Sequence, residues 1–143
     1  MHDRTAILWG AILGATGVAL GAFGAHALHN YLASRNLGSA WETAVHYQLF
    51  HAVALVGFAG WVRAGNQSGP SGSVRCRRAA WAVRLWIAGT LLFSVSLYLL
   101  ALGAPVIVGA ITPLGGAALI GGWIAAALTA RAEESVQRPG SPA

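Results

Sequence analysis

Polar and titratable side chains concentrate in one stretch of the sequence, residues 41–52 (WETAVHYQLFHA). Glu42, His46, Tyr47, Gln48 and His51 stand there at the head of a run that is otherwise apolar as far as residue 62. Carboxylate and imidazole groups can exchange protons, ligate a metal ion or hydrogen-bond a solute. Which of these functions is open to them depends on which side chains share a face of the helix.

The spacing in this stretch divides it between two helix faces. Glu42 and His46 are four residues apart and share a face, as do Tyr47 and His51. His46 and His51 are five apart, which places them ~140° apart around a helix. The two histidines therefore point in different directions.

A metal or haem site would need histidines from elsewhere in the chain. His26 and His29 follow the preceding apolar run, and a site of His26, His29 and His46 with Glu42 is geometrically allowed. As paired axial ligands, His26 and His46 are possible by depth, whereas His51, ~15 Å below residue 41, is a poor partner for His26. None of these sets has a recognised ligand spacing. We therefore expect no cofactor and keep metal or haem binding as a second alternative.

The composition predicts a membrane protein. The 143 residues are 56% hydrophobic and only 9% charged, against about 25% charged in soluble domains. All nine basic residues are arginine and the net charge is +5. In so apolar a chain, clustered arginines indicate membrane flanks rather than nucleic-acid binding. The lone cysteine, Cys76, excludes an internal disulfide and a cysteine-cluster metal site.

Four hydrophobic runs are long enough to cross a bilayer, which takes about 20 residues of helix. They span residues 6–28, 41–62, 80–102 and 106–130. We predict an all-α, four-helix transmembrane bundle as a single domain, 1–130, and a disordered cytoplasmic tail, 131–143. The first run also resembles a signal peptide, because residues 25–27 read AHA. Its length favours a retained helix.

Arginine positions predict the orientation of this bundle. Four spans place both termini and the loop 65–73 on one side, with eight of the nine arginines: Arg4, Arg63, Arg75, Arg77, Arg78, Arg84, Arg131 and Arg138. Only Arg35 falls on the other side. The positive-inside rule then places both termini in the cytoplasm, with the bundle in the inner membrane. Trp9, Trp61 and Trp81 are expected at the inner interface and Trp41 at the outer one.

Local signals add three expectations. Gly10 with Gly14, and Gly17 with Gly21, form a small-residue stripe that favours packing within the chain over packing between protomers. Residues 31–39 are typical of a short connection that ends in a helix cap at Ser39, with Glu42 completing a capping box. Pro113 is expected to free a carbonyl near Gly109, where it could line a cavity or be satisfied by a neighbouring helix.

In this topology the polar side chains gather in the outer half of the bundle. The third helix adds Ser94, Ser96 and Tyr98, and the fourth adds Thr112. The simplest interpretation is that they hydrogen-bond across helices, with Tyr98, Ser94 and Thr112 as partners for Tyr47, Gln48 and His51. The alternative is a pocket or conducting path. The candidate residues are His26, Glu42, Tyr47, Gln48, His51, Ser94, Tyr98 and Thr112.

Catalytic motifs are missing from the sequence: it has no Ser-His-Asp order, nucleotide-binding loop or zincin helix, and Asp3, the only aspartate, lies outside the predicted spans. We therefore expect a non-enzymatic structural or accessory membrane component. The first alternative is a small-solute or proton conductor that uses the outer-half polar cluster. The expected partners are the lipid bilayer and either further copies of the chain or a larger membrane complex.

Five sequence blocks resemble one family. They are residues 21–28 (GAFGAHAL), 41–48 with 51–52, 93–98 (FSVSLY), 111–116 (ITPLGG) and 122–123. They are similar to the uncharacterised small inner-membrane family that contains transmembrane protein 256, domain of unknown function 423. The resemblance implies a four-helix integral membrane protein and no assigned molecular role. It favours as shared positions His26, Tyr47, Gln48, His51, Ser94, Tyr98, Thr112 and Pro113.

Two positions depart from the family pattern. Val95 stands between two serines where the family often has glycine, which is expected to crowd that helix contact. His46 stands where glutamine is common, which weakens any site that requires His46.

Overall fold

The computed structural model describes residues 2–65 and 70–137, with side chains over 4–65 and 76–131. Its elements are α1 (His2–Ala25), α2 (His29–Ser34), α3 (Gly38–Ala64), α4 (Pro70–Ala101), the 3₁₀ helix η1 (Val106–Ile111) and α5 (Thr112–Gln137). No residue in these ranges is in a β-strand. The prediction of an all-α fold is therefore confirmed.

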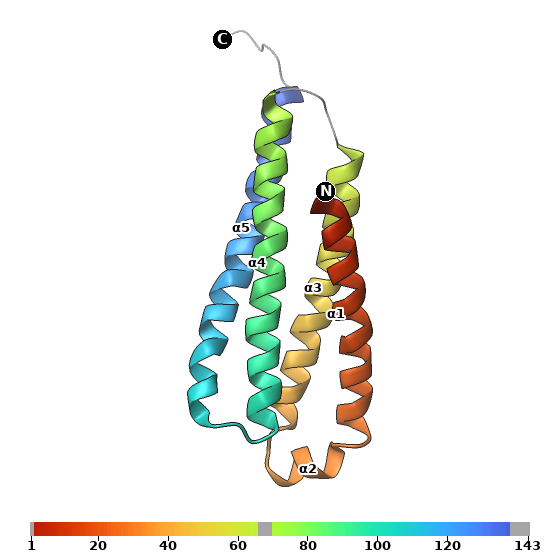
Figure 1. Ribbon diagram of the computed structural model, residues 1–143, viewed down its shortest axis with the longest axis vertical. Helices are drawn as coiled ribbons and strands as arrows, with labels where there is room; N and C mark the ends of the chain where they lie inside the picture. The colour runs from red at the N-terminus through yellow and green to blue at the C-terminus, as the bar shows by residue number, and fades with distance from the viewer. Residues whose placement is uncertain (1, 66–69, 138–143) are drawn as a thin grey trace.

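The long helices α1, α3, α4 and α5 lie side by side in the bundle (Figure 1). The described chain has four segments long and apolar enough to cross a membrane: Arg4–Ala25, Gly38–Ala64, Cys76–Ala101 and Val106–Arg131. Helix α1 begins and α5 ends at the same end of the bundle, which we call the terminal end, and α2 lies at the opposite end, the α2 end (Figure 1). The chain begins and ends at the same end of the bundle because it crosses the bundle an even number of times.

The helices form two pairs. Helix α1 packs along α3 and α5 packs along α4, and the contact between α3 and α4 joins the pairs. A core towards the terminal end is centred on Leu13, Leu55 and Trp86. A second core at the α2 end includes Trp41 and Tyr98. The two cores therefore stabilise the two ends of the bundle.

The glycine stripe of α1 faces α3. A Cβ atom at Gly10 would lie 2.6 Å from Val56 Cγ2, and one at Gly17 would lie 2.7 Å from Leu49 Cδ2. Without these methyl groups the two backbones can approach closely. The prediction that the stripe packs within the chain is confirmed.

The connection between the first two spans contains a helix that the sequence analysis missed, α2. Asn36 has a φ of 53°, a left-handed conformation that asparagine tolerates, and this turn lets α3 begin at Gly38. The residue before α3 is Leu37, without a side-chain cap. Ser39 lies inside the first turn, where its carbonyl accepts a bond from Thr43 Oγ1 at 2.8 Å. The predicted capping box of Ser39 and Glu42 is therefore wrong.

The later helices begin and end elsewhere than predicted. Helix α4 begins at Pro70 rather than near residue 80, because proline suits the first turn of a helix. Helix α5 continues to Gln137, into the segment predicted as a tail. The rest of that tail, 138–143, and the part of the predicted loop over 66–69 lie outside the described residues.

Pro113 is the second residue of α5, where its missing N–H removes no helical bond. The carbonyl of Gly109 accepts a bond from the Thr112 N–H. The expected free carbonyl near Gly109 is therefore satisfied locally, and the alternative that it lines a cavity is not supported.

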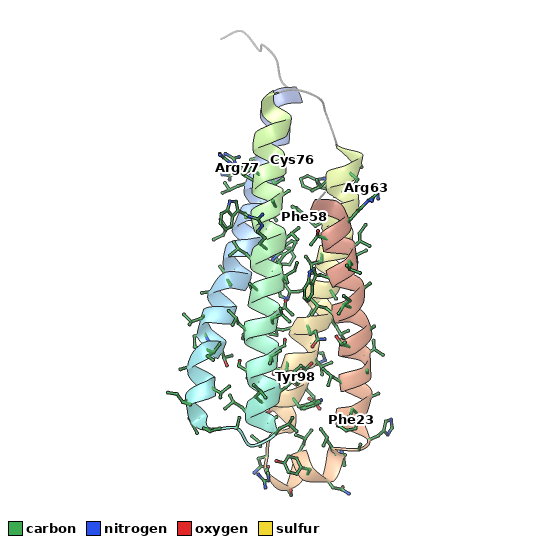
Figure 2. All side chains as sticks on the ribbon, viewed as in Figure 1. Phe23, Phe58, Arg63, Cys76, Arg77 and Tyr98 are labelled. Carbon is green, nitrogen blue, oxygen red and sulfur yellow. The ribbon has the colours of Figure 1, made fainter. Side chains whose placement is uncertain are left out.

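Two arginines lie at the end of the bundle where they were predicted, but Trp41 does not lie at the predicted membrane interface. Figure 2 shows Arg63 and Arg77 at the terminal end, as the sequence analysis expected. Trp41 was expected at a membrane interface, but only 3% of its surface is exposed. Its indole N–H donates to the Leu20 carbonyl of α1 at 3.0 Å, and its ring lies against Gly24, where a Cβ would collide with it. The absent side chain of Gly24 gives Trp41 its place in the core.

Candidate functional site

Gln48 joins three helices at the centre of the polar interior. Its Nε2 donates to the Leu13 carbonyl at 2.9 Å and to Thr16 Oγ1 at 2.8 Å, both on α1. Its Oε1 accepts the hydroxyl of Tyr98 on α4 at 3.0 Å. The side chain is 4% exposed, so one buried amide uses both its donor and its acceptor groups across helices.

A second bond between α3 and α4 lies beside this amide. Ser94 Oγ donates to the Ala44 carbonyl at 2.9 Å, and the ring of Tyr98 packs 4.8 Å from the ring of Trp41, between centroids. Val95, expected to crowd this contact, is 44% exposed. Its side chain therefore lies outside the close contact that Ser94 and Tyr98 make, and the expected crowding is not found.

His51 joins α3 to α5. Trp123 Nε1 donates to His51 Nε2 at 3.2 Å, and His51 Nδ1 lies 2.8 Å from the Tyr47 carbonyl. Because the indole N–H can only donate, Nε2 must accept, and the imidazole proton is on Nδ1. This is a neutral imidazole with both nitrogens occupied. A second proton on Nε2 would place two N–H groups against each other.

Ser96 and Thr112 connect α4 to the start of α5. Their hydroxyl oxygens are 2.7 Å apart, and Ser96 Oγ also donates to the Phe93 carbonyl at 2.9 Å. Since the Ser96 proton is used in that bond, Thr112 is the donor between the two hydroxyls.

An aromatic cluster surrounds His51 at the junction of α3, α4 and α5. Trp86 lies 6.4 Å from the imidazole and 4.8 Å from Trp123, between ring centroids. Trp86 Nε1 and Thr90 Oγ1 are buried and have no hydrogen-bond partner within the described part of the chain. The α4–α5 side of the interior is therefore less completely bonded than the α1–α3 side.

Tyr47 lies at the edge of the bundle rather than in its interior. It is 42% exposed, and its ring stacks on Phe93 with 4.4 Å between centroids and 29° between planes. Among the described residues no group bonds to its hydroxyl. Packing orients α3 so that Gln48 and His51 face inward, which turns Tyr47 to the side. The interhelix bond predicted for Tyr47 is not found.

The remaining candidates lie at the α2 end. His26 and Glu42 are exposed. Glu42, His29 and His46 line a cavity of about 610 Å³ between α1, α2 and α3, whereas His26 does not line it. Over the described residues, no group of three or more His, Cys, Asp or Glu side chains could hold a metal ion. The alternative metal site of His26, His29 and His46 with Glu42 therefore gains no support.

The structure brings together five of the eight predicted residues as interhelix hydrogen-bonding groups: Gln48, His51, Ser94, Tyr98 and Thr112. The sequence analysis missed Thr16 and Trp123 as their partners. Thr16 carries the only hydroxyl of residues 6–25, which was an available signal. Trp123 was noted only as part of a family block, and its bond to His51 depends on how α5 is oriented.

Comparison with known proteins supports the fold and the family. Residues 20–116, well over half of the chain, match the family model described as "Protein of unknown function (DUF423)". The chain belongs to this family. It is 44% identical over 118 residues to the UPF0382 membrane protein YwdK of Bacillus subtilis, which covers 82% of this chain and 89% of that protein.

Two further relatives come from other bacteria. A UPF0382 membrane protein of Staphylococcus haemolyticus is 41% identical over 82% of this chain and 88% of its own length. The UPF0382 inner membrane protein YgdD of Escherichia coli is 35% identical over 86% of each chain. No solved structure matches. With the four apolar helices, these relatives identify a multi-pass inner-membrane protein.

Proposed function

We propose that this protein is a non-enzymatic structural or accessory component of the inner membrane, with both termini in the cytoplasm. One observation carries the proposal: Gln48, His51, Ser94 and Tyr98 of the interior bond to neighbouring helices. The Gln48 amide uses its oxygen and its nitrogen, and His51 uses both ring nitrogens. Groups occupied in this way fix the positions of helices.

Their combined strength is sufficient for that role. A side-chain hydrogen bond between membrane helices contributes ~0.6 kcal/mol on average. The seven bonds described above together contribute on the order of 4 kcal/mol by the same average. That energy favours one arrangement of helices over alternatives with similar apolar packing.

The alternative, that the protein conducts protons, can be tested by measuring proton flux across a membrane that contains it. Full-length protein reconstituted in liposomes with an internal pH dye should conduct protons no faster than empty liposomes. His51→Ala should leave the rate unchanged, because His51 holds α5 rather than relaying protons. An added ionophore checks that the vesicles are sealed. Protein-dependent flux that His51→Ala abolishes would favour the conductor.

The proposed orientation follows from charge. Arg63 and Arg77 lie at the terminal end (Figure 2), and Arg35 follows α2 at the other end. Because arginines near spanning helices remain on the cytoplasmic side, the terminal end is cytoplasmic. Cys76, the only cysteine, is exposed close to these arginines, which makes it a native probe of the orientation.

A membrane-impermeant maleimide should therefore label Cys76 in inverted vesicles and not in intact spheroplasts. The matched control replaces the probe: Cys76→Ser combined with Ser34→Cys moves it to α2, where Ser34 is exposed. This variant should show the reverse pattern. Labelling of native Cys76 from outside spheroplasts would refute the orientation.

An accessory role also requires a partner, either further copies of the chain or other subunits. Purification in a mild detergent after crosslinking in the membrane should recover the protein in an assembly larger than one chain. Repeated recovery of a bare protomer, at native expression level, would contradict the accessory role and leave a purely structural one.

A further inference from the structure

The cavity at the α2 end lies outside the hydrogen-bonded interior. Its volume of about 610 Å³ is in the range of small-molecule pockets, roughly 300–1,000 Å³. Gly21 and Gly24 of α1 and Trp41 and Val45 of α3 form an apolar wall. The rest of the lining includes polar side chains that can carry a charge.

Three titratable side chains line this cavity: His29 at the start of α2, and Glu42 and His46 one turn apart on α3. All three are exposed. None of them has a hydrogen bond, ion pair or ring contact with another described residue. They therefore retain their full capacity to bind a ligand, unlike Gln48 and His51.

The charges of these groups select the ligand. The Glu42 carboxylate attracts a cation and forms its strongest hydrogen bonds with an ammonium N–H. It repels a ligand that carries only a phosphate. The imidazoles of His29 and His46 each offer an N–H to phosphate oxygens. A headgroup with a primary ammonium and a phosphate matches both kinds of group, and a quaternary ammonium has no N–H for Glu42.

The depth of the cavity points to a lipid rather than a free solute. His46 lies eight residues after the first residue of the span Gly38–Ala64, which is ~12 Å along the helix axis. The span of 27 residues is ~40 Å long, longer than the ~30 Å hydrocarbon core, so its first turns lie at the interface and His46 lies near the boundary of the hydrocarbon. An acyl chain can continue from the apolar Val45 and Gly21 along the helices while the headgroup remains at this boundary.

We propose that this cavity binds the phosphoethanolamine headgroup of a phospholipid in the leaflet at the α2 end. Glu42 pairs with the ammonium, and His29 and His46 donate to the phosphate. The proposal goes beyond the structural role above and does not depend on it, because none of the three residues takes part in the interhelix bonds.

Native mass spectrometry of the full-length protein in detergent tests this directly. Phosphatidylethanolamine, phosphatidylcholine and phosphatidylglycerol with identical acyl chains are added in equal amounts. The wild type should retain phosphatidylethanolamine preferentially. Glu42→Gln should lower its retention relative to phosphatidylglycerol about tenfold, the effect of losing one charge-assisted bond. His46→Ala should lower the retention of both phosphatidylethanolamine and phosphatidylglycerol, because it removes a donor to the phosphate.

Two control variants separate the site from general lipid binding. His26→Gln alters an exposed histidine at the same end that does not line the cavity, so retention should not change. Gly38→Leu adds a side chain to a lining residue where a Cβ meets nothing within 4 Å, so it should reduce retention of every lipid. Glu42 is exposed, so Glu42→Gln should elute and melt as the wild type does.

Three outcomes would overturn the proposal. Equal retention of the three lipids, unaffected by Glu42→Gln, would show that the cavity does not recognise a headgroup. Displacement by free phosphoethanolamine at the same concentration as the lipid would assign the site to a soluble ligand. A lipid-free dimer that Gly38→Leu dissociates would assign it to a second copy of the chain.

Discussion

The α1–α3 pair and the α4–α5 pair both pack closely at glycine, but they differ in how completely their buried polar groups are hydrogen-bonded. Both pairs pack apolar helices in a medium where apolar burial gives little drive for association. In the first pair, Gln48 and Trp41 of α3 donate to backbone carbonyls of α1. In the second pair, two buried polar groups of α4, Trp86 Nε1 and Thr90 Oγ1, have no partner among the residues the structure describes.

Close steric fit, together with the bond between Ser96 and Thr112, holds the α4–α5 pair. A Cβ at Gly115 would lie 2.5 Å from the backbone nitrogen of Phe93, and one at Gly122 would lie 2.5 Å from Trp86 Cδ1. The two helices therefore meet backbone to backbone and ring to glycine. Close packing at glycine is therefore common to both pairs, and the hydrogen bonding of the buried polar groups is what differs between them.

The largest effect is expected from Gly115→Ala. The added methyl group meets backbone atoms of Phe93, which cannot rotate away, so α4 and α5 must separate. The free energy of unfolding should fall by about 1–3 kcal/mol, measured by unfolding in mixed micelles. The control is Gly57→Ala, where a Cβ meets nothing within 4 Å. Equal effects of the two substitutions would contradict the steric account.

Gln48→Leu should have the next largest effect, because it leaves the Tyr98 hydroxyl buried without its acceptor. An unsatisfied buried group costs about 1–3 kcal/mol, and the expected loss is near the lower limit because the same group finds other partners in the unfolded state within the membrane. Tyr47→Phe is the matched control, since that hydroxyl is not bonded to any described residue. Its unfolding free energy should stay within about 0.5 kcal/mol of the wild-type value.

Trp123→Phe should have a smaller effect, and it acts on the contact between α5 and α3. It removes the N–H that donates to His51 Nε2 and keeps an aromatic ring against Trp86. The bond should contribute ~0.6 kcal/mol, seen as a small loss of unfolding free energy. A loss as large as that of Gly115→Ala would show that directional bonding to α3, rather than steric fit against α4, holds α5 in place.

Thr90→Val should have the smallest effect, and it should be neutral or stabilising. The substitution conserves volume and removes a buried hydroxyl that has no partner, so up to about 1 kcal/mol can be gained. Unfolding under the same conditions as for Gln48→Leu gives the direct contrast between the pairs. Clear destabilisation would show that Thr90 Oγ1 has a bonding partner in the folded protein.

Much of the architecture could be predicted from the sequence, because hydrocarbon imposes strong rules. The four apolar runs predict four spans, and the glycines of α1 predict a close helix contact. Gln48, His51 and Tyr98 could be expected inside, since polar groups in lipid need partners. These inferences depend only on length, spacing and polarity.

The identity of each partner could not be predicted in the same way. Gln48 bonds to the Leu13 carbonyl and Ser94 to the Ala44 carbonyl, and every residue offers a carbonyl. Tyr47 lies at the edge because rotation of α3 is set by packing, not by the polarity of one side chain. Trp41 is buried because Gly24 makes room for it, which depends on the register between α1 and α3.

A double-mutant cycle on Gln48 and Tyr98 tests most directly whether the polar interior holds the helices together. Gln48→Leu, Tyr98→Phe and the double variant are compared by unfolding free energy, with proton flux recorded on the same reconstituted samples. We predict a favourable coupling of about 0.6–1.7 kcal/mol and flux at the level of empty liposomes throughout. Zero coupling, together with wild-type flux that either substitution abolishes, would contradict the account.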